Sequence, residues 1–223
     1  MTATAWNSLA ERLVKALHPF ADPLAITFSS DRPDGIPAFR EPLAEPTPDG
    51  RTGRVPAGCV FWIKAQEQTF STTAEDHGNC SVGSLTHGFK TLKEAAEGAD
   101  VGALLESGWV AEEVFPHIPV ISEKPGAVTY GPLVDALSDP DVVLLRINPM
   151  AAMVLSDAVP DLKFEGKPQC HIVAMAIDGQ VAVSVGCALS RARTGMRATE
   201  MTCAIPANRL PQVIEQIERT TQV

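Results

Sequence analysis

Two stretches of this chain share one spacing of cysteine and glycine, and an internal repeat constrains a fold more than a local pattern does. Gly88 follows Cys80 by eight residues, and Gly195 follows Cys187 by eight residues. An apolar residue comes directly after each glycine. The second stretch therefore has the form of a degenerate copy of the first.

An earlier cysteine precedes each copy. Cys59 lies twenty-one residues before Cys80, and Cys170 lies seventeen residues before Cys187. Because a pair of cysteines recurs in the same order, we predict that the fold brings all four to one site.

The repeat also predicts how the chain is organised. We expect residues 1–223 to form a single domain, in which two related halves pack about a pseudo-twofold axis. The halves span roughly residues 20–90 and 140–196. Connecting helices would occupy residues 91–137, and a C-terminal helix would occupy residues 206–220.

Helical and strand patterns alternate along the chain, which is typical of the α+β class. Apolar spacing predicts helices at residues 4–18, 92–107, 148–157 and 206–220. Short apolar or β-branched runs predict strands at residues 23–28, 70–73, 127–130, 141–147, 170–177, 180–185 and 200–205. We expect these strands to form mixed sheets with the helices on the outside.

Three local signals refine this assignment. Thr91 and Glu94 have the spacing of a capping box at the start of the helix at 92–107, and Gly98 is a point where that helix can break. Asp178-Gly179 stands between two strand-like runs and is typical of a two-residue β-hairpin. We therefore predict an antiparallel hairpin over residues 170–185.

Residues 29–58 are rich in proline, glycine and aspartate and show almost no periodicity. We expect a long irregular excursion here, and a lid over the site is one interpretation of it.

The composition argues against nucleic-acid and membrane partners. The chain has 27 acidic and 18 basic residues and a net charge of -9, and its basic residues are scattered, whereas a nucleic-acid face needs clustered Lys and Arg. The sequence has neither an apolar run of about 18 residues nor a signal-peptide pattern at its start. We therefore expect a cytoplasmic protein whose five cysteines are reduced.

Familiar catalytic signatures are missing from the sequence. It contains no P-loop, no Gly-x-Gly-x-x-Gly after a strand, no His-Glu-x-x-His and no Gly-x-Ser-x-Gly. Nucleotide hydrolysis, dinucleotide redox chemistry, zinc proteolysis and α/β-hydrolase chemistry are disfavoured accordingly.

Four cysteines at one site allow three interpretations. Cys59, Cys80, Cys170 and Cys187 can hold an iron-sulfur cluster or zinc, they can form a metal-free thiolate site, or they can fill the core. Their wide spacing requires ligands from separate elements, and four thiolates in a protein that has its own core favour a cluster over structural zinc. Cys203 alternates with apolar residues on a strand and is expected to be core.

Two histidines flank Cys80 and are candidates for an acid or base. His77 lies three residues before it and His87 seven residues after it. Cys80 itself begins a predicted helical turn, where backbone N–H groups stabilise a thiolate. A hydrogen-bonded, partly buried side chain is the alternative role for either histidine.

Several motifs resemble one family. They are Cys59-Val60-Phe61-Trp62-Ile63-Lys64-Ala65, His77-Gly78-Asn79-Cys80, Gly83-Ser84-Leu85-Thr86-His87, Tyr130-Gly131-Pro132-Leu133, Pro140-Asp141-Val142-Val143, Gly166-Lys167-Pro168-Gln169-Cys170, Ser184-Val185-Gly186-Cys187 and Glu200. Together they cover roughly residues 20–215 and resemble the ArCR family, domain of unknown function 169, whose bacterial and archaeal members are mostly uncharacterised. The resemblance implies that Cys80, Cys170 and Cys187 occupy motif positions, and it implies little about activity.

The function predicted from the sequence is an iron-sulfur-dependent enzyme that acts on a small molecule at the four-cysteine site. The alternative is a metal-free small-molecule-binding or redox-sensing module with a reactive Cys80 thiolate.

Overall fold

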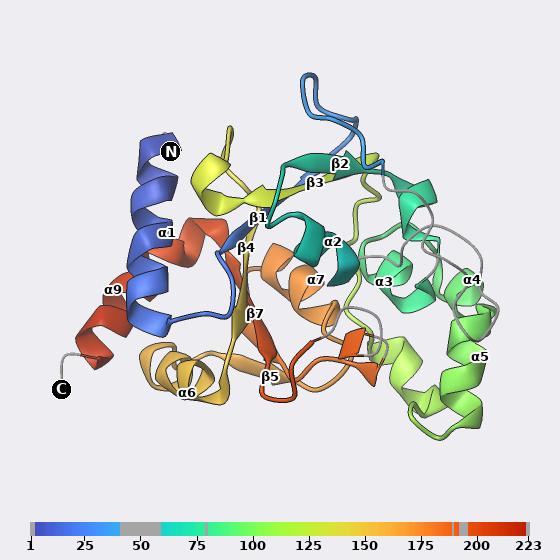
Figure 1. Ribbon diagram of the computed structural model, residues 1–223. Coiled ribbons are helices and arrows are strands. Elements are labelled where there is room, and N and C mark those ends of the chain that lie inside the picture. Colours follow the sequence, from blue (N-terminus) through green and yellow to red (C-terminus); the bar gives the residue numbers. More distant parts are fainter. Residues whose placement is uncertain (1–2, 41–58, 79, 189, 192–195, 222–223) are drawn as a thin grey trace.

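The computed structural model describes residues 3–40, 59–78, 80–188, 190–191 and 196–221 (Figure 1). Its strands are β1 (Leu24–Ser29), β2 (Phe70–Thr72), β3 (Ala127–Pro132), β4 (Val142–Ile147), β5 (Lys163–Glu165), β6 (Ala182–Ser184) and β7 (Met201–Pro206). They form one mixed sheet of seven strands in the order β2-β3-β1-β4-β7-β6-β5. The predicted α+β class is confirmed, with one sheet in place of several.

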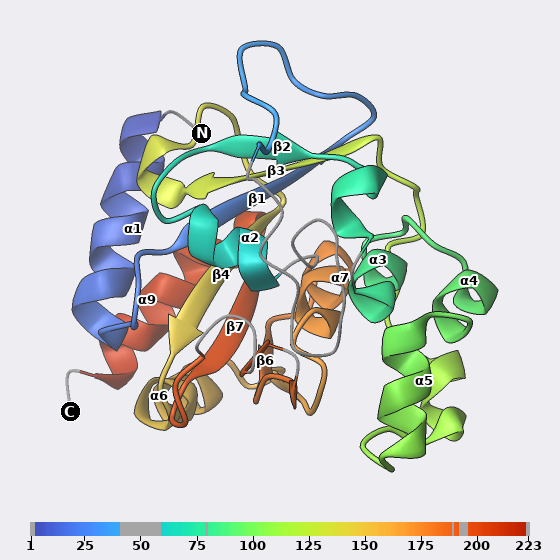
Figure 2. The same cartoon turned by 45° about the vertical axis from the view of Figure 1, so that its right-hand side comes forward.

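Helices cover both faces of this sheet. The α-helices are α1 (Ala3–Leu17), α2 (Cys59–Lys64), α3 (Ser81–Thr86), α4 (Leu92–Ala96), α5 (Ala99–Glu106), α6 (Pro149–Ala158), α7 (His171–Ile177) and α9 (Leu210–Thr220). Four 3-10 turns are η1 (Ala74–His77), η2 (Glu112–His117), η3 (Leu133–Asp135) and η4 (Ala207–Arg209). Figures 1 and 2 show α1, α6 and α9 on one face, α2 and α7 on the other, and α4 and α5 projecting beyond α3.

Each face of the sheet has its own hydrophobic core. Leu13 of α1, Leu155 of α6 and Ile214 of α9 belong to the first core. Trp62 of α2 and Val173 of α7 belong to the second. Both cores draw residues from both predicted halves of the chain.

The strands are arranged alike on the two sides of the β1–β4 pair. Outward from β1 come β3 and β2, and outward from β4 come β7 and β6, each antiparallel to its neighbour. Leu24 of β1 is opposite Pro132 of β3, and Val142 of β4 is opposite Pro206 of β7. On each side, the first residue of the inner strand therefore pairs with the proline that ends its neighbour.

The registers of the outer strand pairs, β2–β3 and β6–β7, also correspond to each other. Phe70 of β2 is opposite Tyr130 of β3, and Ala182 of β6 is opposite Ala204 of β7. Tyr130 and Ala204 each lie two residues before the terminal proline of their strand, so the two registers agree. β5 extends the second side by one strand, parallel to β6.

The predicted hairpin over residues 170–185 is wrong. Residues 171–177 form helix α7, which packs against β4, β6, β7 and α3. Because most of the helix surface is buried, its residues are apolar on nearly every side, and the sequence shows no 3.6-residue alternation of apolar and polar residues. Gly179 has φ of +85° and ends this helix, with Gln180 N–H donating to the Met175 carbonyl. Asp178-Gly179 is therefore a helix C-terminus, because glycine adopts the left-handed conformation at low cost.

Several other local predictions are confirmed. Thr91 and Glu94 form the capping box of α4, and Gly98 separates α4 from α5. Asn148 caps α6. β3 confirms the strand predicted at residues 127–130, which interrupts the stretch 91–137 assigned to connecting helices. β5 was not predicted. Residues 41–58, most of the predicted excursion, lie outside the described residues.

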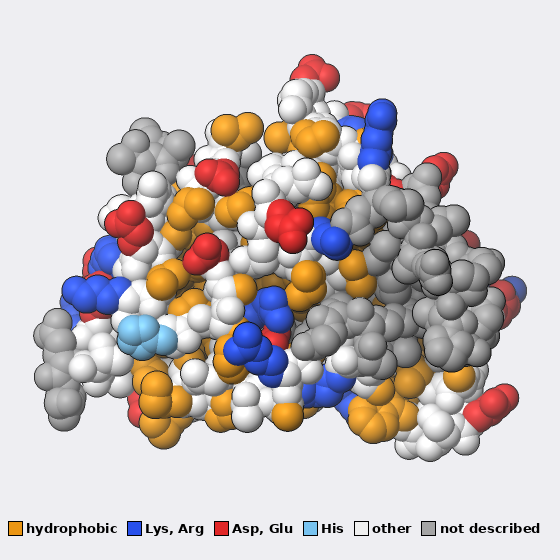
Figure 3. Space-filling view, viewed as in Figure 1, with side chains coloured by type: hydrophobic (Ala, Val, Ile, Leu, Met, Phe, Trp, Pro, Cys, Tyr) orange, Lys and Arg blue, Asp and Glu red, His pale blue; other side chains and the backbone are white. Residues whose placement is uncertain are grey.

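The distribution of surface charge and the character of the helices are relevant to nucleic-acid and membrane partners. On the face seen in Figure 3, acidic and basic side chains are interspersed with hydrophobic ones. Of the helices that the structure describes, none combines the length and apolar character that crossing a bilayer requires.

Candidate functional site

The four predicted cysteines line one cavity of about 400 Å³. Cys59 is the first residue of α2, and Cys170 directly precedes α7. Cys80 caps α3, and Cys187 directly precedes residue 188, which is helical. Four elements that are far apart in the sequence thus bring one cysteine each to the same space.

Cys80 and Cys187 occupy the same local backbone setting. The N–H of Gly83 donates to Sγ of Cys80 at 3.3 Å, and the N–H of Ser190 donates to Sγ of Cys187 at 3.2 Å. In both cases the donor lies three residues after the cysteine, in the first turn of a helix. Each sulfur is therefore held by a backbone hydrogen bond at the start of a helical turn.

Cys170 is the most buried of the four. Burial raises the pKa of its thiol well above the usual value, and the negative charges of Cys80 and Cys187 raise it further. Thr86 opposes this shift. Cys59 raises the pKa as well, so Cys170 lies within electrostatic range of the other three cysteines.

The cysteines nevertheless do not form a single-ion site. Within the described part of the chain, no three His, Cys, Asp or Glu side chains are close enough to hold one metal ion. Cys203 lies in the core on the opposite face of the sheet, fully buried, as predicted for a core residue.

His77 and His87 lie behind the cavity wall, and neither is among the described residues that line the cavity. Both side chains are fully buried. Nε2 of His77 donates to the Thr72 hydroxyl at 3.0 Å, because that hydroxyl donates to the Val128 carbonyl. Nδ1 of His87 donates to the Gly83 carbonyl at 2.8 Å.

Burial keeps both imidazoles neutral. It lowers the pKa of His77 well below its usual value, with the charge of His87 adding to the shift. It lowers the pKa of His87 to about 4, although the bond to Gly83 opposes this. The His87 side chain therefore supports the turn that carries Gly83, whereas the His77 side chain is bonded to Thr72 of β2.

Sequence reasoning missed a polar wall made by residues 165–171. Glu165, Lys167, Gln169 and His171 all line the cavity. Nδ1 of His171 donates to Oε1 of Glu165 at 3.0 Å. Burial lowers the pKa of His171, and Glu165 opposes this shift. The motif Gly166-Lys167-Pro168-Gln169-Cys170 pointed to this wall in the sequence, but only its cysteine was predicted to be a site residue.

An apolar wall faces the polar one. It comes from α5 and the chain through η2 and consists of Val101, Leu104, Trp109, Val110, Val114, Phe115 and Ile118. Lys167 joins the two walls, since its Nζ lies 3.9 Å from the centroid of the Trp109 ring and donates to the Trp109 carbonyl. The cavity is thus lined by cysteines, a set of apolar side chains and a set of polar ones.

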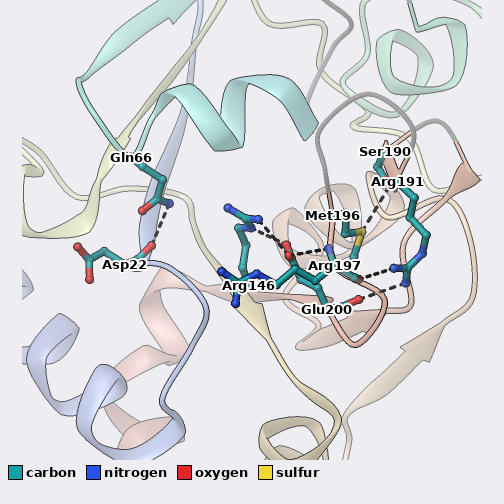
Figure 4. A network of polar contacts seen from close by, with 8 residues as sticks. All are labelled: Asp22, Gln66, Arg146, Ser190, Arg191, Met196, Arg197 and Glu200. Atoms are coloured by element: carbon teal, nitrogen blue, oxygen red, sulfur yellow. Dashed lines mark hydrogen bonds and ion pairs between the residues drawn. The ribbon is translucent and has the colours of Figure 1, made fainter.

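An arginine network holds the segment that carries Cys187 (Figure 4). Arg191 donates to the carbonyls of Val185, Arg197 and Glu200 at 2.6–3.2 Å and so ties the two ends of the segment together. The Glu200 carboxylate is 2% exposed and is paired with Arg146. Charge-assisted bonds of this kind fix geometry.

Comparison with known proteins identifies a family. Comparisons with curated proteins and with solved structures give no match. A family model described as uncharacterised ArCR matches residues 12–216. That range includes β1 to β7 and all four cysteines of the cavity, and the chain therefore belongs to the ArCR family, domain of unknown function 169.

Proposed function

We propose that the chain holds an iron-sulfur cluster through Cys59, Cys80, Cys170 and Cys187 and acts on a small molecule in the adjoining cavity. The observation that carries this proposal is that four thiols from four separate elements line one cavity. A core-filling role would not require them to share a space next to polar side chains.

Within this proposal we infer a cluster in preference to a single ion. Four thiolates around one zinc ion, at about 2.3 Å each, lie roughly 3.8 Å from one another. A cluster places iron and sulfide between its cysteines, so its ligands stand farther apart. The described cysteines share a cavity without meeting the requirement of one ion, which is compatible with the larger group. Zinc is the alternative cofactor.

We also infer that two related halves surround this site about a pseudo-twofold axis. At the β1–β4 pair, Leu24 is opposite Leu144, Ala25 is opposite Val143 and Ile26 is opposite Val142. If β1 residues 24–26 correspond to β4 residues 142–144, a twofold axis between Ala25 and Val143 relates these pairs to one another. The matched registers of the outer strands support the same axis. It would relate Cys80 to Cys187 and Cys59 to Cys170, so the cofactor would lie near it.

The protein's own groups would hold and shield this cofactor. A bound cluster supplies one-electron transfer or an iron site that polarises a substrate. The Gly83 and Ser190 N–H groups orient the sulfurs of Cys80 and Cys187. Burial of Cys170 lowers the local dielectric, and hydrogen bonds and burial are what tune a cluster's potential.

Anaerobic purification tests this proposal. We expect iron and sulfide in near-equal amounts together with visible absorption, all lost in the variants Cys80→Ala and Cys187→Ala. Cys203→Ala is the matched control, because that cysteine lies on the opposite face, and it should keep the iron. Zinc alone would favour the structural-zinc alternative, and folded anaerobic protein without either metal would refute metal binding.

A second candidate function is a metal-free binding or redox-sensing module with a reactive Cys80 thiolate. The hydrogen bond from Gly83 to Sγ and the partial exposure of Cys80 favour it, as does the position of both predicted histidines away from the cavity. In metal-free protein, iodoacetamide should then modify Cys80 fastest of the five cysteines. Equal modification of Cys80 and buried Cys170 would contradict this function.

We further propose a cytoplasmic location and no nucleic-acid partner. The odd number of cysteines, five, suits a reducing compartment, and a net charge of -9 repels a phosphate backbone.

A further inference from the structure

The wall that covers the cysteines belongs to one half of the chain only. Between α3 and β3 the chain builds α4, α5 and η2. At the corresponding place in the second half, only residues 192–200 separate the Cys187 segment from β7. The proposed pseudo-twofold axis relates the cysteines, whereas α4, α5 and η2 have no counterpart in the second half, so a ligand would be recognised on the side of α5 and η2.

This wall is apolar and includes two aromatic rings. Val101 and Phe115 are buried, and Trp109 is 43% exposed at the cavity edge. Lys167 lies over the Trp109 ring and donates to its carbonyl, which positions the indole. A wall of this composition gains free energy by covering an apolar ligand surface, about 25 cal/mol per Å².

The charges around the cavity are predominantly acidic. Among the described residues that line it, Asp100, Glu113 and Glu165 are acidic and Lys167 is basic, and His117 and His171 also line it. Ser81 donates to Asp100 through its N–H at 2.9 Å and its hydroxyl at 2.7 Å. Cysteine thiolates in the lining would add negative charge, so the described charges would repel an anionic ligand.

The polar wall offers hydrogen bonds at one end. Gln169 and His171 are 4% and 6% exposed. Oε1 of Gln169 and Nε2 of His171 are buried without a hydrogen-bond partner among the described residues. An unpaired buried polar atom costs about 1–3 kcal/mol, so a ligand that hydrogen-bonds at this end would offset that cost.

We infer that the cavity binds an uncharged, mainly apolar small molecule with one hydrogen-bonding end, its apolar body against α5 and η2 and its polar end at Gln169 and His171. This inference rests on the proposed small-molecule site and specifies its substrate class. Phosphorylated, sulfonated and carboxylated metabolites are disfavoured by the same charges.

Two matched probes test the inference. N-phenyl-1-naphthylamine is uncharged and has one N–H, and 1-anilinonaphthalene-8-sulfonate has the same ring system with a sulfonate added. In equilibrium dialysis against anaerobically purified protein, we expect the uncharged probe to bind at least about tenfold more tightly, a difference of about 1.4 kcal/mol. Equal or tighter binding of the sulfonate, or no binding of the uncharged probe, would overturn the inference.

Two leucine variants provide the matched control. Leu104→Asp places a carboxylate in the cavity wall and should weaken binding of the uncharged probe at least tenfold. Leu92→Asp makes the same change at a 41% exposed leucine of α4 outside the described lining and should leave binding unchanged. Equal effects of the two variants would show that the probe binds elsewhere and would contradict the inference.

Iron and sulfide measured on the same samples separate this inference from the proposed cofactor. Loss of probe with normal iron in Leu104→Asp supports the inference. Wild-type protein without iron that still prefers the uncharged probe would refute the cluster alone and leave the inference standing.

Discussion

His87 makes the stability of the protein depend on pH. Its ring is fully buried, and burial lowers its pKa from 6.5 to about 4. The unfolded chain therefore takes up a proton near pH 6.5, whereas the folded chain does so only near pH 4. The free energy of unfolding is highest above pH 6.5 and falls as the pH decreases to 4, by about 2 kcal/mol between pH 7.5 and 5 for this group.

Urea unfolding at several pH values would measure this dependence. In the variant His87→Gln the decrease in unfolding free energy between pH 7.5 and 5 should be smaller by about 2 kcal/mol. His117→Gln is the control, because His117 is exposed, and it should keep the wild-type decrease. Identical pH profiles for wild type and His87→Gln would refute the assigned role of burial.

The ion pair of Arg146 and Glu200 is expected to contribute strongly to stability. Glu200 is 2% exposed and Arg146 is 17% exposed, and two hydrogen bonds join them. Arg146→Met would leave a buried carboxylate without its cation, so we expect a loss of about 3 kcal/mol in unfolding free energy.

A surface pair of the same chemistry is the control for that measurement. Arg12 and Glu218 also share two hydrogen bonds, but both side chains are more than a third exposed. Arg12→Met should therefore cost less than about 1 kcal/mol in chemical denaturation. Equal losses in the two variants would mean that burial does not distinguish the pairs.

At the level of elements, amphipathic helices were predictable and buried ones were not. α1 and α9 each have one apolar face over several turns, and their sequence patterns identify them. α7 is buried by strands and by α3 on different sides, so its residues are apolar almost throughout. Such a run fits a strand equally well, because period is the only local signal that separates the two.

Substitution of Gly179 tests the finding that residues 178–179 end helix α7 and do not form a hairpin turn. Gly179 has φ of +85°, and a Cβ there would meet nothing within 4 Å. Gly179→Ala should therefore cost about 1 kcal/mol through backbone strain alone. The expected loss can be measured by thermal or chemical denaturation.

Gly102 is the matched control for this change. It lies inside α5 and also has open space around its Cβ position, but its φ is not positive. Gly102→Ala should stabilise the protein by up to about 1 kcal/mol, because alanine favours the helix. Destabilisation by Gly102→Ala, or no effect of Gly179→Ala, would contradict these conformational assignments.

For the whole molecule, the repeated cysteines predicted more of the site than the local patterns did. The spacing of Cys59, Cys80, Cys170 and Cys187 predicted that they would share one site, and all four line the cavity. Glu165 and His171 carry no comparable spacing signal. Their part in the cavity depends on α5 and η2 folding over them, which no local pattern encodes.

The single domain predicted for residues 1–223 can be tested by cooperative unfolding. β1 and β4, one from each half, pair at the centre of the sheet, and both cores contain residues of both halves. Neither half can bury its apolar face alone. We therefore expect all parts of the sheet and both cores to unfold in one transition.

Trp6 and Trp62 report on opposite faces of the sheet, since Trp6 belongs to the core with α1 and Trp62 to the core with α2. In variants that keep only one of them, with Trp109 and the other replaced by phenylalanine, fluorescence and far-ultraviolet circular dichroism should give the same urea midpoint. Each comparison is made within one variant, so the stability lost by substitution cancels. If Trp62 fluorescence changed at lower urea than the dichroism, the cysteine-bearing face would unfold separately, and the single-domain prediction would be wrong.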